Sequence, residues 1–134
     1  MTRCLAVAPT EPAAVLASVL VVDDDPLILR AFRRMVRPLD VRLICCGSSE
    51  EALALLETES PVLIICDYQL PGMDGLSFLR LAQGRCPGAR MVLHTGTTMV
   101  PAPSSGIGFL PKPSDTGEIQ ELVRRCCWPR QTPP

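Results

Sequence analysis

The chain has 134 residues, enough for one domain of ordinary size built around a single core. Its 13 basic and 14 acidic residues leave a formal net charge of -1, which gives no general attraction to nucleic acid or to an anionic membrane. The longest apolar stretch, Ala13 to Val22, is much shorter than the roughly 20 residues that cross a bilayer. Pro9, Glu11 and Pro12 interrupt what would have to be the apolar part of a secretory signal, so we expect a cytoplasmic protein.

The seven cysteines do not have the spacing of a disulfide framework or of a zinc site. Their number is odd, Cys45–Cys46 and Cys126–Cys127 are adjacent pairs, and no C-x-x-C motif occurs. We expect them to be small buried apolar residues in a reducing compartment.

Short apolar runs alternate along the chain with segments of helical period, a pattern that predicts a parallel sheet with helices on both faces. Residues 1–17 and 128–134 are rich in proline and are expected to be poorly ordered tails around a domain at 18–127. The predicted strands are Ser18 to Val22, Val41 to Cys46, Val62 to Cys66, Met91 to Thr95 and Gly108 to Leu110.

The first predicted helix begins with Asp25 as N-cap and Pro26 as its first residue. Its inward face is expected to carry Ile28, Ala31, Phe32 and Met35, which are spaced at i, i+3, i+4 and i+7.

The second predicted helix begins at a capping box formed by Ser48 and Glu51 and directs Ala52, Leu55 and Leu56 inward. The third covers about Gly75 to Gln83 and is ended by Gly84 and Pro87.

The last predicted helix begins at Asp115, with Glu118 three residues later, and aligns Ile119, Leu122, Val123 and Cys126 on one face. A helix between Thr95 and the last strand is expected to be shortened or absent. The segment from Gly96 to Ile107 contains two prolines and two glycines, and these cost a helix about 3 and about 1 kcal/mol each.

Polar side chains follow four of the predicted strands: Asp23, Asp24 and Asp25 the first, Asp67 the third, Thr95 the fourth and Lys112 the fifth. The carboxyl ends of parallel strands meet in one crevice, where open α/β sheets bind ligands. Clustered carboxylates suit Mg²⁺, and a carboxylate such as that of Asp67 can also accept a phosphoryl group. Lys112 and Thr95 could contact the phosphoryl oxygens.

On these residues the chain resembles the receiver domains of two-component response regulators, in particular single-domain chemotaxis regulators. The matching motifs are VLVVDDDP at 19–26, DYQLPGMDG at 67–75, LHTG at 93–96 and FLPKP at 109–113. The resemblance covers about residues 18–127. It implies a flavodoxin-like, doubly wound five-stranded parallel sheet of order 2-1-3-4-5.

The resemblance also implies a role for each site residue. Asp67 is the phosphoacceptor, and Asp23, Asp24, Asp67 and the backbone carbonyl of Gln69 hold Mg²⁺. Thr95 and Lys112 contact the phosphoryl group, Thr95 and Phe109 form the conformational switch, and the Lys112–Pro113 peptide bond is cis. Gln69 and Thr97 influence the rate of dephosphorylation.

Two positions depart from the family pattern. Thr95 and Lys112 are 17 positions apart, several fewer than is usual, and the missing length falls where a helix should lie. The surface through which many receivers signal is therefore altered. Gly96 also replaces the small side chain that usually follows the switch threonine.

Three groups of residues have simpler structural interpretations. Asp25 is better explained as a helix cap than as a metal ligand. His94, the only histidine, is expected to be a satisfied, partly buried side chain rather than a phosphohistidine or ligand. The arginines of the first helix, Arg30, Arg33, Arg34 and Arg37, form a solvated face that could also dock a kinase or phosphotransfer protein.

The leading hypothesis is a signalling receiver that takes a phosphoryl group from a sensor histidine kinase or a histidine phosphotransfer protein, with Mg²⁺ and without turnover of a separate substrate. One alternative is a receiver-like module that binds proteins independently of phosphorylation. A less favoured one is a haloacid-dehalogenase-like phosphatase with Asp23 as nucleophile and Asp25 as acid. Because the sequence ends soon after the last helix, output by protein contact is expected unless the chain belongs to a larger protein.

Overall fold

The computed structural model describes residues 16–96 and 106–128. Five parallel strands form one sheet in the order β2-β1-β3-β4-β5, as the sequence predicts. The strands are β1 (Ser18–Val22), β2 (Arg42–Cys46), β3 (Leu63–Asp67), β4 (Arg90–Thr95) and β5 (Ile107–Pro111). The first prediction is correct at both ends, and the other four are within one residue of the observed bounds.

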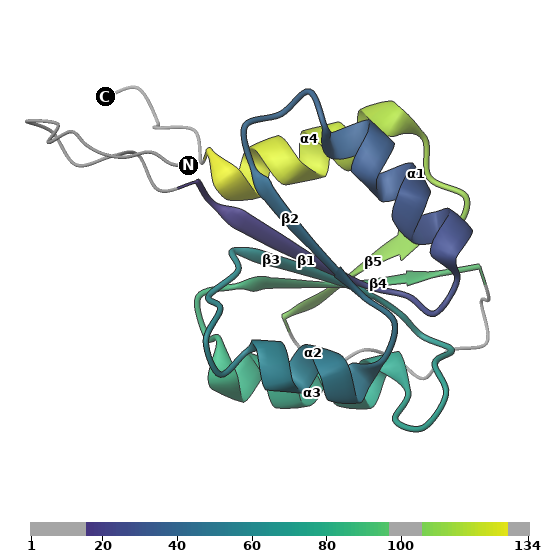
Figure 1. Ribbon diagram of the computed structural model, residues 1–134, viewed down its shortest axis with the longest axis vertical. Coiled ribbons are helices and arrows are strands. Elements are labelled where there is room, and N and C mark those ends of the chain that lie inside the picture. The colour runs from purple at the N-terminus through teal and green to yellow at the C-terminus, as the bar shows by residue number, and fades with distance from the viewer. Residues whose placement is uncertain (1–15, 97–105, 129–134) are drawn as a thin grey trace, which may run out of the picture.

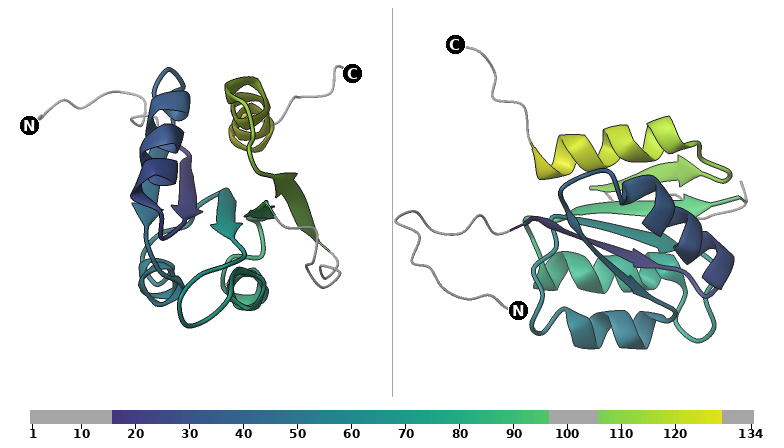
Figure 2. Two further views of the ribbon diagram at one scale, coloured as in Figure 1. Left: turned by 90° about the vertical axis from the view of Figure 1, so that its right-hand side faces the viewer. Right: turned by 45° about the horizontal axis from the view of Figure 1, so that its top comes forward.

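Helices cover both faces of the sheet (Figures 1 and 2). In the described residues they are α1 (Pro26–Val36), α2 (Ser49–Leu55), α3 (Gly75–Arg85) and α4 (Thr116–Cys127). Helices α1 and α4 lie together on one face and α2 and α3 on the other (Figure 1). The fold is therefore flavodoxin-like. The expected tails lie almost entirely outside the described residues, as does most of the segment 96–107 in which a shortened or absent helix is expected.

Two hydrophobic cores flank the sheet. Phe32 of α1 and Ile119 of α4 pack with Val21 and Ile65 on one face, while Phe78 of α3 belongs to the core on the other face. The interior strands β1 and β3 are buried along their whole length, which explains why their sequences are continuous apolar runs rather than alternating ones.

The predicted starts of the first and last helices are confirmed. The Asp25 carboxylate accepts a hydrogen bond of 2.9 Å from the Leu27 N–H, and Pro26 is the first residue of α1. Asp115 and Glu118 form a complete capping box at α4, with reciprocal bonds of 2.7 and 3.1 Å.

The predicted capping box of α2 forms only in part. Ser48 Oγ accepts from the Glu51 N–H at 3.1 Å, but the Glu51 carboxylate accepts from the N–H of Gly47, one residue earlier than a capping box requires.

The predicted end of α3 at Gly84 is wrong. The helix continues to Arg85, because a single glycine costs only about 1 kcal/mol and the Cys86 N–H still bonds to Ala82. Pro87 follows directly after the cap.

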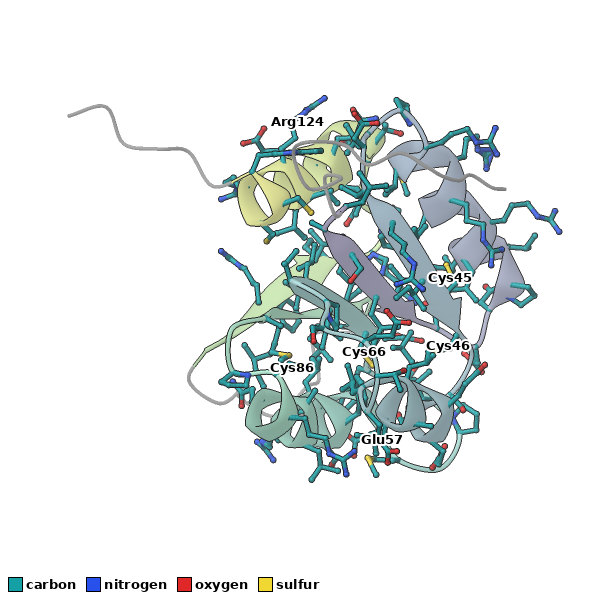
Figure 3. All side chains as sticks on the ribbon, turned by 60° about the vertical axis from the view of Figure 1, so that its left-hand side comes forward. Cys45, Cys46, Glu57, Cys66, Cys86 and Arg124 are labelled. Carbon is teal, nitrogen blue, oxygen red and sulfur yellow. The ribbon has the colours of Figure 1, made fainter. Side chains whose placement is uncertain are left out.

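The cysteines in the described residues are free thiols, of which only Cys46 and Cys66 are buried; Cys45, Cys86, Cys126 and Cys127 are partly exposed. Figure 3 labels Cys45, Cys46, Cys66 and Cys86. Burial raises the pKa of Cys46 to about 12 and that of Cys66 well above the usual range, so these two thiols are unreactive at neutral pH.

Candidate functional site

Two buried carboxylates meet at the carboxyl ends of the neighbouring strands β1 and β3. Asp23 follows β1 directly and Asp67 is the last residue of β3, while Val22 and Cys66 are paired in register just before them. With the exposed Asp24 they form a cluster in which one ligand atom of each residue lies within 4.8 Å of the others. The cluster lies where the strand order reverses, the usual ligand position in such sheets.

Lys112, the residue directly after β5, closes this cluster. Its Nζ lies 3.2 Å from Oδ2 of Asp23 and 3.3 Å from Oδ1 of Asp67. The backbone holds the lysine in place, because the Lys112 N–H donates to the carbonyl oxygen of Thr95 at 2.9 Å. The Lys112–Pro113 peptide bond is cis, as the resemblance implied.

The electrostatics of the cluster favour the binding of a cation in addition to the ammonium of Lys112. Burial raises the pKa of Asp23, and the nearby charge of Asp67 adds to this effect. The hydrogen bond of 2.9 Å from the Asp25 N–H and the ammonium of Lys112 lower it but do not fully compensate. Burial alone would lower the pKa of Lys112, but the carboxylates outweigh that effect and raise it, so the lysine is charged at neutral pH.

Thr95 lies on the remaining side of the cluster. It is the last residue of β4, and its neighbour His94 is paired in register with Asp67. Thr95 is 3% exposed and extends one position beyond Asp67 along the adjacent strand. The sheet therefore brings together the ends of β1, β3, β4 and β5, each carrying one of the polar groups that the sequence singled out.

Two other expected site residues lie further out. Gln69 is exposed in the loop that follows β3, two residues after Asp67. Phe109 lies on the edge strand β5 with 47% of its surface exposed. The roles of the Gln69 carbonyl as a metal ligand and of Phe109 as a switch remain predictions.

The donor set of the cluster fits Mg²⁺. Three carboxylates offer hard oxygen ligands, and the exposed position of Asp24 leaves room for water molecules, which Mg²⁺ retains when bound to proteins. Asp25 is not a member of this cluster, and its carboxylate caps α1.

The prediction that the hydrogen bonds of His94 are satisfied is wrong. It is buried, and its Nε2 has no hydrogen-bond partner. The ring packs edge-on against Phe32, with centroids 5.4 Å apart and planes at 87°. Burial, and then the charge of Lys112, lowers the pKa of His94 to about 4. The ring is therefore neutral at neutral pH.

The start of α3 at Gly75 was predicted correctly, but sequence reasoning missed the backbone contact that this glycine makes. The Gly75 N–H donates to the carbonyl of Tyr68 at 2.8 Å, which closes the loop that follows Asp67. Asp74, the N-cap of α3, accepts from the backbone and the hydroxyl of Ser77 and fixes the other end of this loop. An Asp-Gly pair at a helix start was the available signal.

Comparisons with known proteins identify the family of this chain. The sequence model of the family described as response regulator receiver domain matches residues 19–124. The transcriptional activator protein ExaE of Pseudomonas putida is 34% identical over 116 residues, which cover 80% of this chain and 53% of that protein. The DNA-binding transcriptional regulator NtrC of Salmonella typhimurium is 31% identical over 112 residues, which cover 80% of this chain and 24% of that protein. The chain thus matches only about a quarter to half of the length of these relatives.

Solved structures give the same assignment. The signal receiver domain of an HD domain-containing protein from Pseudomonas fluorescens superposes with a TM-score of 0.78 at 26% identity, covering 84% of this chain and 94% of that one. A CheY-like response regulator receiver domain protein from Methanospirillum hungatei gives a TM-score of 0.74 at 25% identity, covering 83% and 93%. The fold, the four motifs and the family match agree, and the chain belongs to the response regulator receiver domains of two-component systems.

Proposed function

We propose that this chain is a phosphoacceptor, in which the carboxylate of Asp67 takes a phosphoryl group from a phosphohistidine of a sensor histidine kinase or a histidine phosphotransfer protein. The observation that carries the proposal is the position of Lys112, whose ammonium bridges Asp67 and Asp23 at 3.3 and 3.2 Å. A lysine between the proposed acceptor and a proposed metal ligand is placed to offset the negative charge of an incoming phosphoryl group.

In the proposed reaction an oxygen of Asp67 attacks phosphorus while the bond from phosphorus to the donor imidazole nitrogen breaks, and the electron pair of that bond leaves with the imidazole. The products are an aspartyl phosphate and a free histidine side chain. Asp67 Oδ1 contacts Lys112, so this contact must reorganise when a phosphoryl group is present. The hydroxyl of Thr95 is then a donor for one phosphoryl oxygen, by resemblance to the family.

Mg²⁺ would be held by Asp23, Asp24, Asp67 and the Gln69 carbonyl, and when bound it would offset negative charge on the phosphoryl group. Asp23 is rigidly oriented for this role, since Oδ1 accepts from the Asp25 N–H and Oδ2 faces Lys112. The protein would act on no separate substrate and would pass its signal through a change in population around Thr95 and Phe109.

The two alternatives are separated from this proposal by geometry and by experiment. The phosphatase hypothesis requires Asp25 as the acid, but that carboxylate caps α1. The phosphorylation-independent module differs only in whether the site accepts a phosphoryl group. The described residues contain no helix long and apolar enough to span a membrane. We propose a cytoplasmic location and contacts with proteins rather than with nucleic acid.

The deciding experiment measures binding of beryllium fluoride, a mimic of the phosphoryl group, to the full chain with Mg²⁺, by NMR. We expect saturable shifts at Asp67, Thr95 and Lys112 that require both Mg²⁺ and the Asp67 carboxylate and are absent in Asp67→Asn. Asp25→Asn is the matched control and should bind as the wild type does. Failure of the wild type to bind would favour the phosphorylation-independent module. Steady hydrolysis of a phosphomonoester that survives Asp67→Asn but not Asp23→Asn would favour the phosphatase.

A further inference from the structure

A cavity of about 240 Å³ lies between α1 and the residues that follow β5. Its walls come from α1, from His94 of β4, and from Lys112, Pro113 and Ser114, with Ile119 of α4 completing them. Lys112 lines the cavity, and its ammonium bridges Asp23 and Asp67, which do not line it. The cavity is thus a neighbour of the phosphoacceptor cluster and is distinct from it.

The walls from α1 are apolar. They comprise the stripe that the sequence predicts to face inward, Ile28, Ala31, Phe32 and Met35. Of these only Phe32 is fully buried, and the other three are partly exposed because the stripe borders a cavity instead of a filled core. At the packing density of protein interiors, this volume accommodates about ten non-hydrogen atoms. That is the size of one aromatic ring with a small substituent.

His94 adds to the cavity wall a polar side chain that needs a hydrogen-bond partner. The ring lines the cavity, the residue is 5% exposed, and Nε2 has no hydrogen-bond partner. A buried polar atom without a partner carries a desolvation cost that a bound ligand can recover. A hydroxyl group suits either tautomer of a neutral imidazole, because it can donate to a bare nitrogen and accept from a protonated one.

We propose that this cavity binds a small neutral aromatic molecule that carries a hydroxyl group, and that the hydroxyl is the missing partner of His94 Nε2. A carboxylate or an ammonium is a poorer occupant, since the walls are apolar and Lys112 is already paired with two carboxylates. Nε2 is sealed from water in the structure, so the proposed binding requires the imidazole to turn about its Cβ–Cγ bond and present the nitrogen to the ligand. The inference does not depend on phosphorylation of Asp67.

The test is a titration of the full chain with phenol and with toluene, which have nearly the same shape and differ in the hydroxyl group. We expect saturable amide shifts at Ile28, Ala31, Met35 and Ser114 and a shift of the His94 ring nitrogens with phenol. Toluene should bind about tenfold more weakly, because it leaves Nε2 unpaired.

Two variants make the test specific. Ala31→Leu adds bulk within the cavity and should weaken both ligands, while His94→Leu should remove the preference for phenol and retain toluene binding. Circular dichroism and an unfolding curve establish that each variant is folded. If either does not fold, the wild-type comparison and the His94 ring shifts still decide the question. Equal affinities for the two ligands, absence of saturable shifts, or a preference for phenol that persists in His94→Leu would overturn the proposal.

Discussion

Gly75 begins α3 in such close contact with Asp67 that no other residue fits there without movement. A Cβ atom on Gly75 would lie 2.7 Å from the carbonyl carbon of Asp67 and closer still to its oxygen. The first turn of α3 therefore rests on the backbone of the proposed phosphoacceptor, and the requirement for glycine is one of space rather than of an unusual φ angle.

Gly75→Ala should weaken Mg²⁺-dependent binding of beryllium fluoride by about tenfold or more, because a displacement of about 1 Å at a reacting group is costly. The measurement is a Mg²⁺ and beryllium fluoride titration followed by NMR. Gly84→Ala is the matched control in the same helix, where an added Cβ meets no atom within 4 Å. It should leave binding unchanged and stabilise the protein by about 0.5 to 1 kcal/mol. Equal binding by both variants would show that Asp67 is not positioned by this contact.

Asp23→Asn should stabilise the protein in the absence of Mg²⁺. Burial raises the pKa of Asp23, so the folded state binds a proton at this carboxyl more tightly than the unfolded state does. Stability from this group is therefore lost as the pH rises from the ordinary value of 3.8 through the raised pKa, and at pH 7 the ionised form is a cost. Removing the charge should raise the free energy of unfolding by about 1 kcal/mol, measured by urea denaturation.

The control for this prediction is Asp24→Asn, which changes an exposed carboxylate in the same cluster and should have a smaller effect. Saturating Mg²⁺ should abolish or reverse the advantage of Asp23→Asn, because the metal stabilises only the protein that retains its ligand. A destabilised Asp23→Asn protein in metal-free buffer would contradict the prediction and would mean that the contact with Lys112 outweighs the burial of charge.

His94 should make the protein less stable in mild acid. Its pKa is about 4 in the folded protein and about 6.5 when exposed, so the unfolded state takes up a proton first as the pH falls. Its contribution is complete above pH 6.5, declines below it and is fully lost below pH 4. Between pH 7.5 and pH 5 this one group should lower the free energy of unfolding by about 2 kcal/mol.

Comparison with His94→Leu isolates this effect, since His94 is the only histidine in the chain. The difference in free energy of unfolding between the two proteins, from urea curves at several pH values, should change by that amount over the same interval. A difference that is independent of pH would mean that the folded protein accommodates the imidazolium.

Charge reversal on α1 should affect transfer from a protein donor but not from a small one. Arg33 and Arg34 are exposed in the last turn of the helix. The double variant Arg33→Glu, Arg34→Glu should slow phosphotransfer from a cognate kinase at low salt by about tenfold and weaken its salt dependence. Phosphorylation by acetyl phosphate is the internal control and should be unaffected. Unchanged kinetics with the kinase would exclude a docking role for this face.

Much of the fold could be predicted because its determinants are local. The apolar runs of β1 and β3 are continuous since both strands are buried on two sides, and Asp25 and Asp115 cap their helices by contacts within three residues. The convergence of Asp23, Asp67 and Lys112 followed from parallel strands that end at the same edge. Their positions are as expected, while their chemical roles await experiment.

The features that could not be predicted depend on the packing between segments that are far apart in the sequence. Helical period assigned Ile28, Ala31 and Met35 to the inward face, but period does not reveal that β4 and the residues after β5 leave a cavity beneath them. The unpaired nitrogen of His94 has the same origin, because a hydrogen-bond partner is a matter of tertiary geometry. The continuation of α3 through Gly84 shows that a weak local preference yields to the packing of the rest of the helix.

The strand order also determines the direction from which the site can be reached. The chain leaves β1 toward the face covered by α1 and leaves β3 toward the face covered by α3, so the backbone diverges above the adjacent carboxylates (Figures 1 and 2). Under the proposed function, a protein donor would therefore approach end-on, parallel to the strands, and would carry its phosphoryl group on a projecting side chain. Partner selection would begin with this directional constraint, before any specific contact with α1 is made.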